Sequence, residues 1–312
     1  MTPARRIILD CDPGHDDAVA ILLAAGTPEI ELAAITTVAG NHGLELTTLN
    51  ALRVCSLAGL TGVPVAAGCA EPLMRELVTA PEIHGEKGLE GYNWPQPSLR
   101  QAPEHAVDLI VDLVMSSRAG ELTLVPTGPL TNIALAAKRE PRIVQQVREV
   151  VLMGGSFTRG NQTPAAEFNV HVDPEAAAIV FAAGWPVTMV GLDVTHAAAA
   201  TPAVLERIAA VDSEIARAVL GLLRFYGERE RQPAGPREAA VHDAVAVARV
   251  ARPALVECAG AHVEVELTGR LTTGMTVTDF RERPGRPFNA QVATRLDFER
   301  FWDLVLAAIE RL

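Results

Sequence analysis

Short apolar runs alternate with segments of helical periodicity along most of this chain. Runs typical of buried strands lie at residues 7–9, 30–37, 63–67, 122–125, 147–153 and 187–192. Helical spacing of apolar residues between these runs predicts helices over residues 18–23, 44–57, 106–115 and 133–138, and after Asp173. Strands that are apolar on both faces and separated by helices indicate an α/β protein with a mostly parallel central sheet covered by helices.

The last third of the chain changes pattern. One or two helices are expected over residues 202–231, and a further helix begins at His242. Short strands at 262–267, 276–280 and 290–296 predict a small peripheral β unit near the C-terminus, before a closing helix over 297–312. Residues 71–99 lack periodicity, and loops of this length are uncommon unless they cover a site. With no internal repeat or linker, residues 1–312 are expected to form a single domain.

Four carboxylates surround the turn that follows the first strand. They are Asp10, Asp12, Asp16 and Asp17, on either side of Pro13-Gly14. Like charges this close repel one another, so a positive partner is expected. The start of the following helix supplies part of it, and a divalent cation would supply the rest. Oxygen ligands favour Ca²⁺ or Mg²⁺ over zinc. The alternative is that two acids cap the helix and two are solvated.

Further candidate positions lie at the ends of later strands. Asn41 follows the second strand, Thr127 the strand at 122–125, and Met153 and Gly154 end the strand at 147–153. In open parallel sheets, ligands bind outside the carboxyl ends of the strands. We therefore expect one ligand site that unites these positions with the acidic turn.

Composition narrows the classes of partner. The net charge is −11, Lys87 and Lys138 are the only lysines, and the arginines are scattered, which argues against nucleic-acid binding. No apolar stretch has the length of a membrane span, and the N-terminus enters the first strand without a signal region, so a cytoplasmic location and no membrane partner are expected. The four cysteines are dispersed, which favours reduced thiols, and alternation along the strand predicts that Cys11 is a packing residue.

Six segments in order along the chain together resemble one known family. They are residues 10–18 (DCDPGHDDA), 38–41 (VAGN), 127–132 (TGPLTN), 153–155 (MGG), 167–169 (EFN) and 242–243 (HD). With these segments the chain resembles the nucleoside hydrolases, calcium-dependent enzymes that cleave the N-glycosidic bond of ribonucleosides. The resemblance implies a ribonucleoside substrate, a Ca²⁺ cofactor and assembly as a homodimer or homotetramer.

The resemblance also implies roles for individual residues. The metal ligands would be Asp12, Asp17, Asp243 and the backbone carbonyl of Thr127. Asp12 would also be the general base that takes a proton from the attacking water. The ribose hydroxyls would be held by Asp16, Asn41, Glu167 and Asn169, with Asn161 and Met153 nearby. Carboxylates around the sugar would stabilise a transition state that resembles an oxocarbenium ion.

The leaving base is expected to meet histidines. By resemblance, His242 protonates or hydrogen-bonds the base; the alternative is a histidine that only orients Asp243. His84 matches a loop histidine near the base, and its alternative is a solvated loop residue. Tyr226 and Arg229 lie in a segment that closes over the base in relatives, whereas His15 and His42 are expected to be structural.

The tryptophans bear on base preference. Purine-specific members of the family place tryptophans on both sides of the base, but Trp94, Trp185 and Trp302 lie elsewhere in this chain. Together with His242, this favours either a pyrimidine preference or a broad inosine and uridine preference, and the sequence leaves that choice open.

Two rival functions share the acidic turn. An Asp-x-Asp pair after an apolar strand also opens the haloacid-dehalogenase phosphatases, in which Asp10 would be the nucleophile. That alternative lacks a suitable lysine and a late acidic pair, and a carboxylate-rich pocket would repel phosphate. A non-catalytic calcium-binding or ribose-binding protein would use the same acids without turnover.

Overall fold

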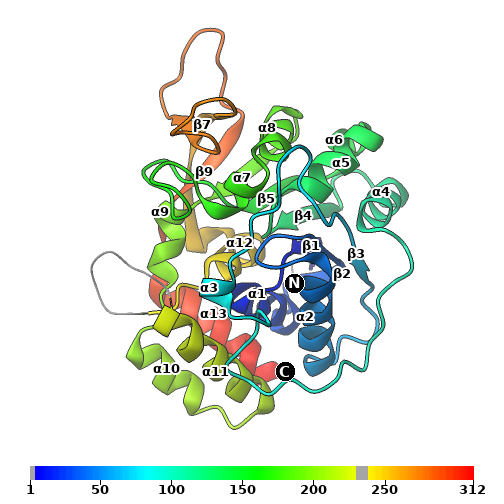
Figure 1. The fold of residues 1–312 in the computed structure, drawn as a ribbon, viewed down its shortest axis with the longest axis vertical. Helices are drawn as coiled ribbons and strands as arrows, with labels where there is room; N and C mark the ends of the chain where they lie inside the picture. Colours follow the sequence, from blue (N-terminus) through cyan, green and yellow to red (C-terminus); the bar gives the residue numbers. More distant parts are fainter. Residues whose placement is uncertain (1–3, 230–237) are drawn as a thin grey trace.

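A twisted sheet runs through the centre of the molecule (Figure 1). The computed structural model describes residues 4–229 and 238–312. In these residues, nine strands form one sheet in the order β3-β2-β1-β4-β5-β6-β9-β7-β8. The strands are β1 Arg5–Cys11, β2 Ile30–Thr37, β3 Val65–Ala67, β4 Leu122–Pro126, β5 Glu149–Met153, β6 Val187–Val190, β7 Val256–Val265, β8 Thr276–Asp279 and β9 Ala290–Leu296. β1 to β6 are all parallel, as predicted.

Helices cover both faces of this sheet. They are α1 His15–Gly26, α2 Leu44–Leu57, α3 Pro81–His84, α4 Ala106–Ser116, α5 Thr131–Arg139, α6 Ile143–Gln146, α7 Phe168–Val172, α8 Pro174–Ala182, α9 Leu192–Thr195, α10 Pro202–Ala209, α11 Glu214–Arg229, α12 His242–Ala251 and α13 Phe298–Arg311, with single 3₁₀ turns at His196–Ala198 and Pro253–Leu255. None of the helices within the described residues is long and apolar enough to cross a membrane.

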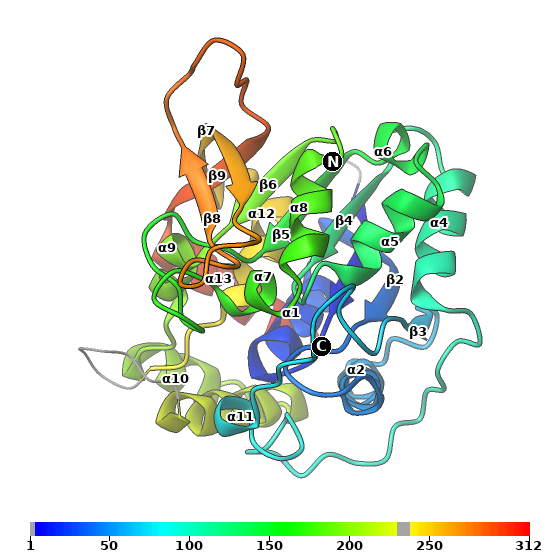
Figure 2. The same cartoon turned by 45° about the horizontal axis from the view of Figure 1, so that its top comes forward.

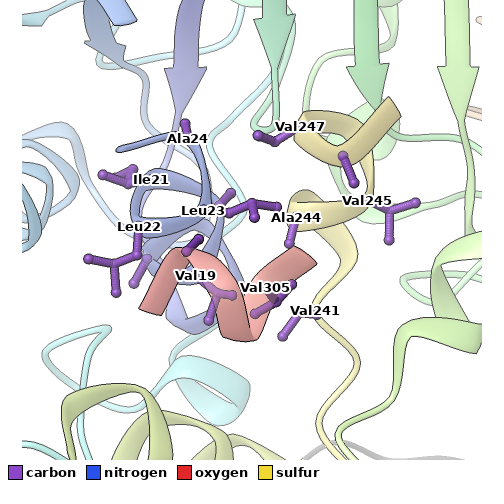
Figure 3. Packing of buried hydrophobic residues seen from close by; sticks show 14 of the residues in the cluster. Val19, Ile21, Leu22, Leu23, Ala24, Val241, Ala244, Val245, Val247 and Val305 are labelled. Carbon is purple, nitrogen blue, oxygen red and sulfur yellow. The ribbon is translucent and has the colours of Figure 1, made fainter. Parts of the chain in front are cut away.

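The core consists of two apolar layers, one on each face of the sheet. On one face, α1 packs against α12 and α13, and side chains such as Leu23, Ala244 and Val305 meet between them (Figure 3). On the other face, α4, α5 and α8 cover the sheet. Alternation along β1 explains both layers, because Ile7 and Leu9 join the first and Ile8 the second. Cys11 is fully buried in the first layer, which confirms its packing role.

The predicted β unit at the C-terminus continues the main sheet. β9 pairs in parallel with β6, and β7 and β8 follow as antiparallel strands at the end of the sheet (Figure 2). β7 begins at Val256, earlier than its periodicity predicts. Four helices were not predicted, namely α3, α6, α7 and α9, because four or five residues are too few to display helical periodicity. The region predicted as one or two helices forms α10 and α11, and its end at residues 230–231 lies outside the described residues.

Candidate active site

A cavity of about 510 Å³ opens at the carboxyl end of the parallel strands. Its lining brings together segments after β2, β4 and β5, and the first turns of α1, α7 and α12. The predicted site residues that line it are Asp16, Asn41, His84, Thr127, Met153, Asn161, Glu167, Asn169, His242 and Asp243. The other two, Asp12 and Asp17, are fully buried beside it. The sheet edge thus unites residues that are up to 231 positions apart (Asp12 and Asp243).

Three carboxylates converge at the base of the cavity. Asp16, Asp17 and Asp243 each place an oxygen within 4.8 Å of the others. Asp16 and Asp17 stand in the first turn of α1, and Asp243 stands in the first turn of α12. Two helix N-termini therefore point their unpaired N–H groups at this cluster, which partly offsets its negative charge. Asp16, which the resemblance assigns to ribose, belongs to this cluster by position.

Asp12 is held at the edge of this cluster. Its Oδ2 accepts a hydrogen bond from the Asn41 backbone N–H at 2.7 Å, and its Oδ1 is buried without a hydrogen-bond partner among the described residues. A Cβ added at Gly40 would lie 2.1 Å from Oδ2, and one added at Gly128 would lie 2.6 Å from Oδ1. The two glycines therefore allow the backbone to approach the carboxylate more closely than any side chain would permit.

Asp17 connects the strand ends. Its Oδ1 accepts from the Thr127 hydroxyl at 2.9 Å, and its Oδ2 accepts from the Gly14 backbone N–H at 3.0 Å and the Asn41 amide at 3.3 Å. Burial and the charge of Asp16 raise the pKa of Asp17 to about 7. Burial and the neighbouring acids likewise raise the pKa values of Asp12 and Asp243 well above their usual range.

These buried acids fit a hard divalent cation. All the groups offered are oxygens, and the unpaired Oδ1 of Asp12 lacks a positive or hydrogen-bonding partner in the part of the chain that the structure describes. Placing several carboxylates out of water without such a partner is costly. A cation with a preference for oxygen ligands would satisfy both observations.

Asp10 stands apart from this cluster, although it belongs to the same acidic turn. Its Oδ1 accepts from the Thr36 hydroxyl at 2.6 Å and the Asn132 amide at 2.8 Å. Asn132 also donates to the Thr37 carbonyl and accepts from the Cys69 N–H. Asp10 therefore ties neighbouring strand ends together and does not line the cavity.

Two further polar side chains that line the cavity are held by backbone groups. Glu167 caps α7 by accepting from the N–H groups of Asn169 and Val170, and it also accepts from Gly155 at 2.9 Å. The Asn169 amide donates to the Thr127 carbonyl at 2.7 Å and to the Met153 carbonyl at 3.2 Å. These contacts fix a carboxylate and an amide in rigid positions, which suits recognition of hydroxyl groups.

Two histidines reach the cavity from different elements. His242 begins α12, and its Nδ1 lies 2.7 Å from the Thr195 hydroxyl. His84 ends α3 and is only 5% exposed, so the alternative of a solvated loop residue is wrong. Burial and the nearby histidines lower the pKa of His84 well below its usual value.

An aromatic stack supports His84. The ring of His15 lies parallel to those of His84, Phe225 and Tyr226, with centroids 5.2 to 5.5 Å apart. The His15 backbone N–H donates to His84 Nδ1, and burial lowers the pKa of His15 to about 4. His15 is thus structural, as expected. Tyr226 lines the cavity, whereas Arg229 packs over Phe225 at 4.4 Å from the ring centroid and is not among the lining residues.

Sequence reasoning missed several residues of the cavity wall. They include Ile83, Arg159, Gln162, Phe168 and His196. His196 follows β6 and the short helix α9, so its position after a strand end was a usable signal. Arg159 and Gln162 lie in an irregular segment, and Ile83 and Phe168 belong to α3 and α7, which are too short to display periodicity.

Comparisons with known proteins identify the family of this chain. The family model described as inosine-uridine preferring nucleoside hydrolase matches residues 7–303. The chain is 55% identical to the inosine-uridine preferring nucleoside hydrolase of Crithidia fasciculata, over 99% of this chain and 98% of that protein. It is 44% identical to the pyrimidine-specific ribonucleoside hydrolase of Photobacterium profundum, over 97% of each chain.

Solved structures show the same fold. A plant nucleoside hydrolase, 33% identical, superposes with a TM-score of 0.92 over 99% of both chains. A purine-preferring ribonucleoside hydrolase from Gardnerella vaginalis, also 33% identical, gives a TM-score of 0.92 over 98% of both chains.

The chain therefore belongs to the nucleoside hydrolase family and has the fold that the resemblance implied. It is a ribonucleoside hydrolase, an enzyme that cleaves the bond between ribose and base with water. Membership of this family, and the turn of Asp10 away from the cavity, rule out the phosphatase alternative.

Proposed function

We propose that this enzyme hydrolyses the N-glycosidic bond of inosine and uridine in a Ca²⁺-dependent reaction. The observation that carries the proposal is the convergence, at one cavity, of a carboxylate cluster, polar side chains anchored to the backbone, and two histidines. Such a cavity offers places for a metal ion, a ribose and a nucleobase.

The residues that would hold the metal are Asp12, Asp17, Asp243 and the carbonyl of Thr127. Their donors are all oxygens, and Ca²⁺ takes six to eight oxygen ligands, which leaves positions for water and ribose hydroxyls. The Thr127 carbonyl accepts from Asn169 but has a second lone pair for a cation. When bound, the ion would lower the pKa of water and hold the ribose hydroxyls.

Asp12 is the proposed general base. Its Oδ1 has no hydrogen-bond donor among the described residues, so it can accept a proton from the attacking water. Its other oxygen is fixed by the Asn41 N–H, which holds the carboxylate in one orientation. Asp16, Asn41, Glu167 and Asn169 would bind the ribose. The carboxylates of Asp16 and Glu167 would stabilise the positive charge that develops on the sugar.

His242 is the proposed residue that assists departure of the base. It lines the cavity from the start of α12, and its Nδ1 is engaged by Thr195, so Nε2 is the nitrogen for the substrate. The alternative, that His242 only orients Asp243, predicts equal losses for substrates with good and poor leaving groups when the ring is removed.

A preference for both inosine and uridine is the better supported specificity. Relatives 55% and 54% identical are described as inosine-uridine preferring, whereas the pyrimidine-specific relatives are 44% to 45% identical. His84 and Tyr226 line the cavity where a base would stack, and a stacking surface accepts one ring or two. Assembly into a homodimer or homotetramer, and a single domain over 1–312, stay predictions.

Ribose release from uridine, inosine, cytidine and adenosine, with and without a calcium chelator, tests the proposal. We expect chelator-sensitive release that is fastest with uridine and inosine, and restoration by added Ca²⁺. Release that chelator leaves unchanged would contradict the metal requirement. Comparable ribose release from uridine and cytidine, with none from inosine, would instead indicate the pyrimidine-specific alternative.

A further inference from the structure

The ring of His242 is held from behind by the turn that follows β6. Thr195 ends α9, is fully buried, and places its hydroxyl oxygen 2.7 Å from His242 Nδ1. A separation of 2.7 Å is typical of a strong hydrogen bond between a hydroxyl and a ring nitrogen. Thr195 does not line the cavity, so its contact with His242 is its link to the site.

The direction of this hydrogen bond follows from which of the two groups can donate and which can accept. Within the described residues, His242 Nδ1 is the acceptor within reach of the Thr195 O–H, and a buried hydroxyl proton without an acceptor is costly. The hydroxyl therefore donates, and Nδ1 carries the lone pair. The proton of the neutral ring then sits on Nε2, the nitrogen on the side away from Thr195.

The neighbouring His196 restricts rotation of the His242 ring by packing against it from a second direction. Its ring meets that of His242 edge to face, with centroids 5.3 Å apart and planes at 87°. His196 is itself anchored, because its Nδ1 lies 2.7 Å from the Leu192 carbonyl. Rotating the His242 ring by a half-turn would put a carbon against the Thr195 hydroxyl and leave that buried group unpaired.

We propose that Thr195 is a positioning residue for the leaving-base step: its hydroxyl fixes both the orientation and the tautomer of His242, so that Nε2–H faces the substrate. This inference rests on the role proposed for His242. Thr195 itself touches no substrate and acts through the imidazole. The Nε2–H of the neutral ring donates a hydrogen bond to the departing base, so the contribution of Thr195 should appear only with substrates whose base needs such a donor to depart.

The test compares Thr195→Val with Thr195→Ser, using Thr123→Val as a matched control. Valine keeps the shape of threonine and removes the hydroxyl, whereas serine keeps the hydroxyl. Thr123 is a buried threonine of β4 whose hydroxyl has no hydrogen-bond partner within the described chain, so its replacement removes no such contact. Each variant is assayed with uridine, inosine and 4-nitrophenyl riboside, whose leaving group departs without protonation.

We expect Thr195→Val to lower kcat for uridine and inosine by roughly tenfold or more, the scale set by loss of a buried hydrogen bond. KM and the rate with 4-nitrophenyl riboside should stay close to wild type, and Thr195→Ser should recover most of the loss. Equal losses with all three substrates, or no recovery by serine, would overturn the inference. If Thr195→Val does not fold, Thr195→Ala removes the same hydroxyl with a smaller side chain.

His242→Ala separates this inference from the proposed function. A selective loss for uridine and inosine in His242→Ala, with none in Thr195→Val, would refute the role of Thr195 and leave the role of His242 intact. Equal losses for all substrates in His242→Ala would refute the role of His242 itself, and with it the inference.

Discussion

Replacing Gly40 with alanine tests whether catalysis depends on the position of Asp12. The added Cβ would lie 2.1 Å from Asp12 Oδ2 and 2.7 Å from Cδ of Pro129. Ordinary van der Waals contacts begin near 3.4 Å, so the Asp12 carboxylate must move away by about 1.3 Å, the difference between 3.4 Å and 2.1 Å. That movement would break the 2.7 Å hydrogen bond from the Asn41 N–H, because the same oxygen accepts it.

The expected effect on activity exceeds the effect on folding. Overpacking a buried site costs about 1–3 kcal/mol in the free energy of unfolding, and the melting temperature should fall by about 2–6 °C. A reactive group displaced by about 1 Å can lose about 100-fold in rate. We therefore expect kcat with uridine to fall by about two orders of magnitude in a protein that remains folded at assay temperature.

Gly43→Ala is the matched control on the same loop. Nothing lies within 4 Å of a Cβ added there, and the backbone at φ −61° and ψ 151° is open to alanine. Steady-state kinetics with uridine and thermal unfolding are measured for both variants. A Gly40→Ala enzyme with wild-type kcat would refute the argument, and an equal loss in Gly43→Ala would show that the loop, not Asp12, is responsible.

Three further predictions concern the acids and the sugar. Asp12→Asn should abolish turnover while retaining much of the Ca²⁺ affinity, measured by calorimetry, because asparagine keeps an oxygen ligand and loses the basic carboxylate; full activity would refute the general-base role. In the metal-free enzyme, the raised pKa values of Asp12, Asp17 and Asp243 mean that the folded state holds protons that the unfolded chain releases near pH 4, so stability falls as pH rises. Below pH 6.5, the lowered pKa values of His15 and His84 make stability rise with pH, because the unfolded chain binds protons that these buried rings do not. The melting temperature should therefore fall between pH 6.5 and 8, where the acids decide the trend, and a rise there would contradict the raised pKa values of the acids. Deoxyuridine should be a poor substrate because it lacks the 2′-hydroxyl that the metal and carboxylates bind, and turnover comparable to that of uridine would argue against this arrangement.

Much of the fold could be predicted because it follows from local pattern. Apolar runs and helical spacing located the strands of the parallel sheet and its longer helices, and alternation along β1 placed Cys11 in the core. The position of Asn41, Thr127 and Met153 after strand ends predicted a common site, since parallel strands bring their carboxyl ends to one edge. The roles of Glu167, Asn169 and Asp243 depended on family resemblance, because they lie in a loop or at helix starts without distinctive periodicity.

The sequence by itself determined the strand, turn and helix that carry the acids, since these depend on neighbours along the chain. Only the tertiary structure decided which acids meet: Asp10 turns to Thr36 and Asn132, while Asp243 arrives from α12 to join Asp16 and Asp17. The same holds for Thr195 behind His242 and for β9 beside β6. Such contacts join residues far apart in sequence, and their partners are selected by packing of the whole sheet and its helices, which no local pattern encodes.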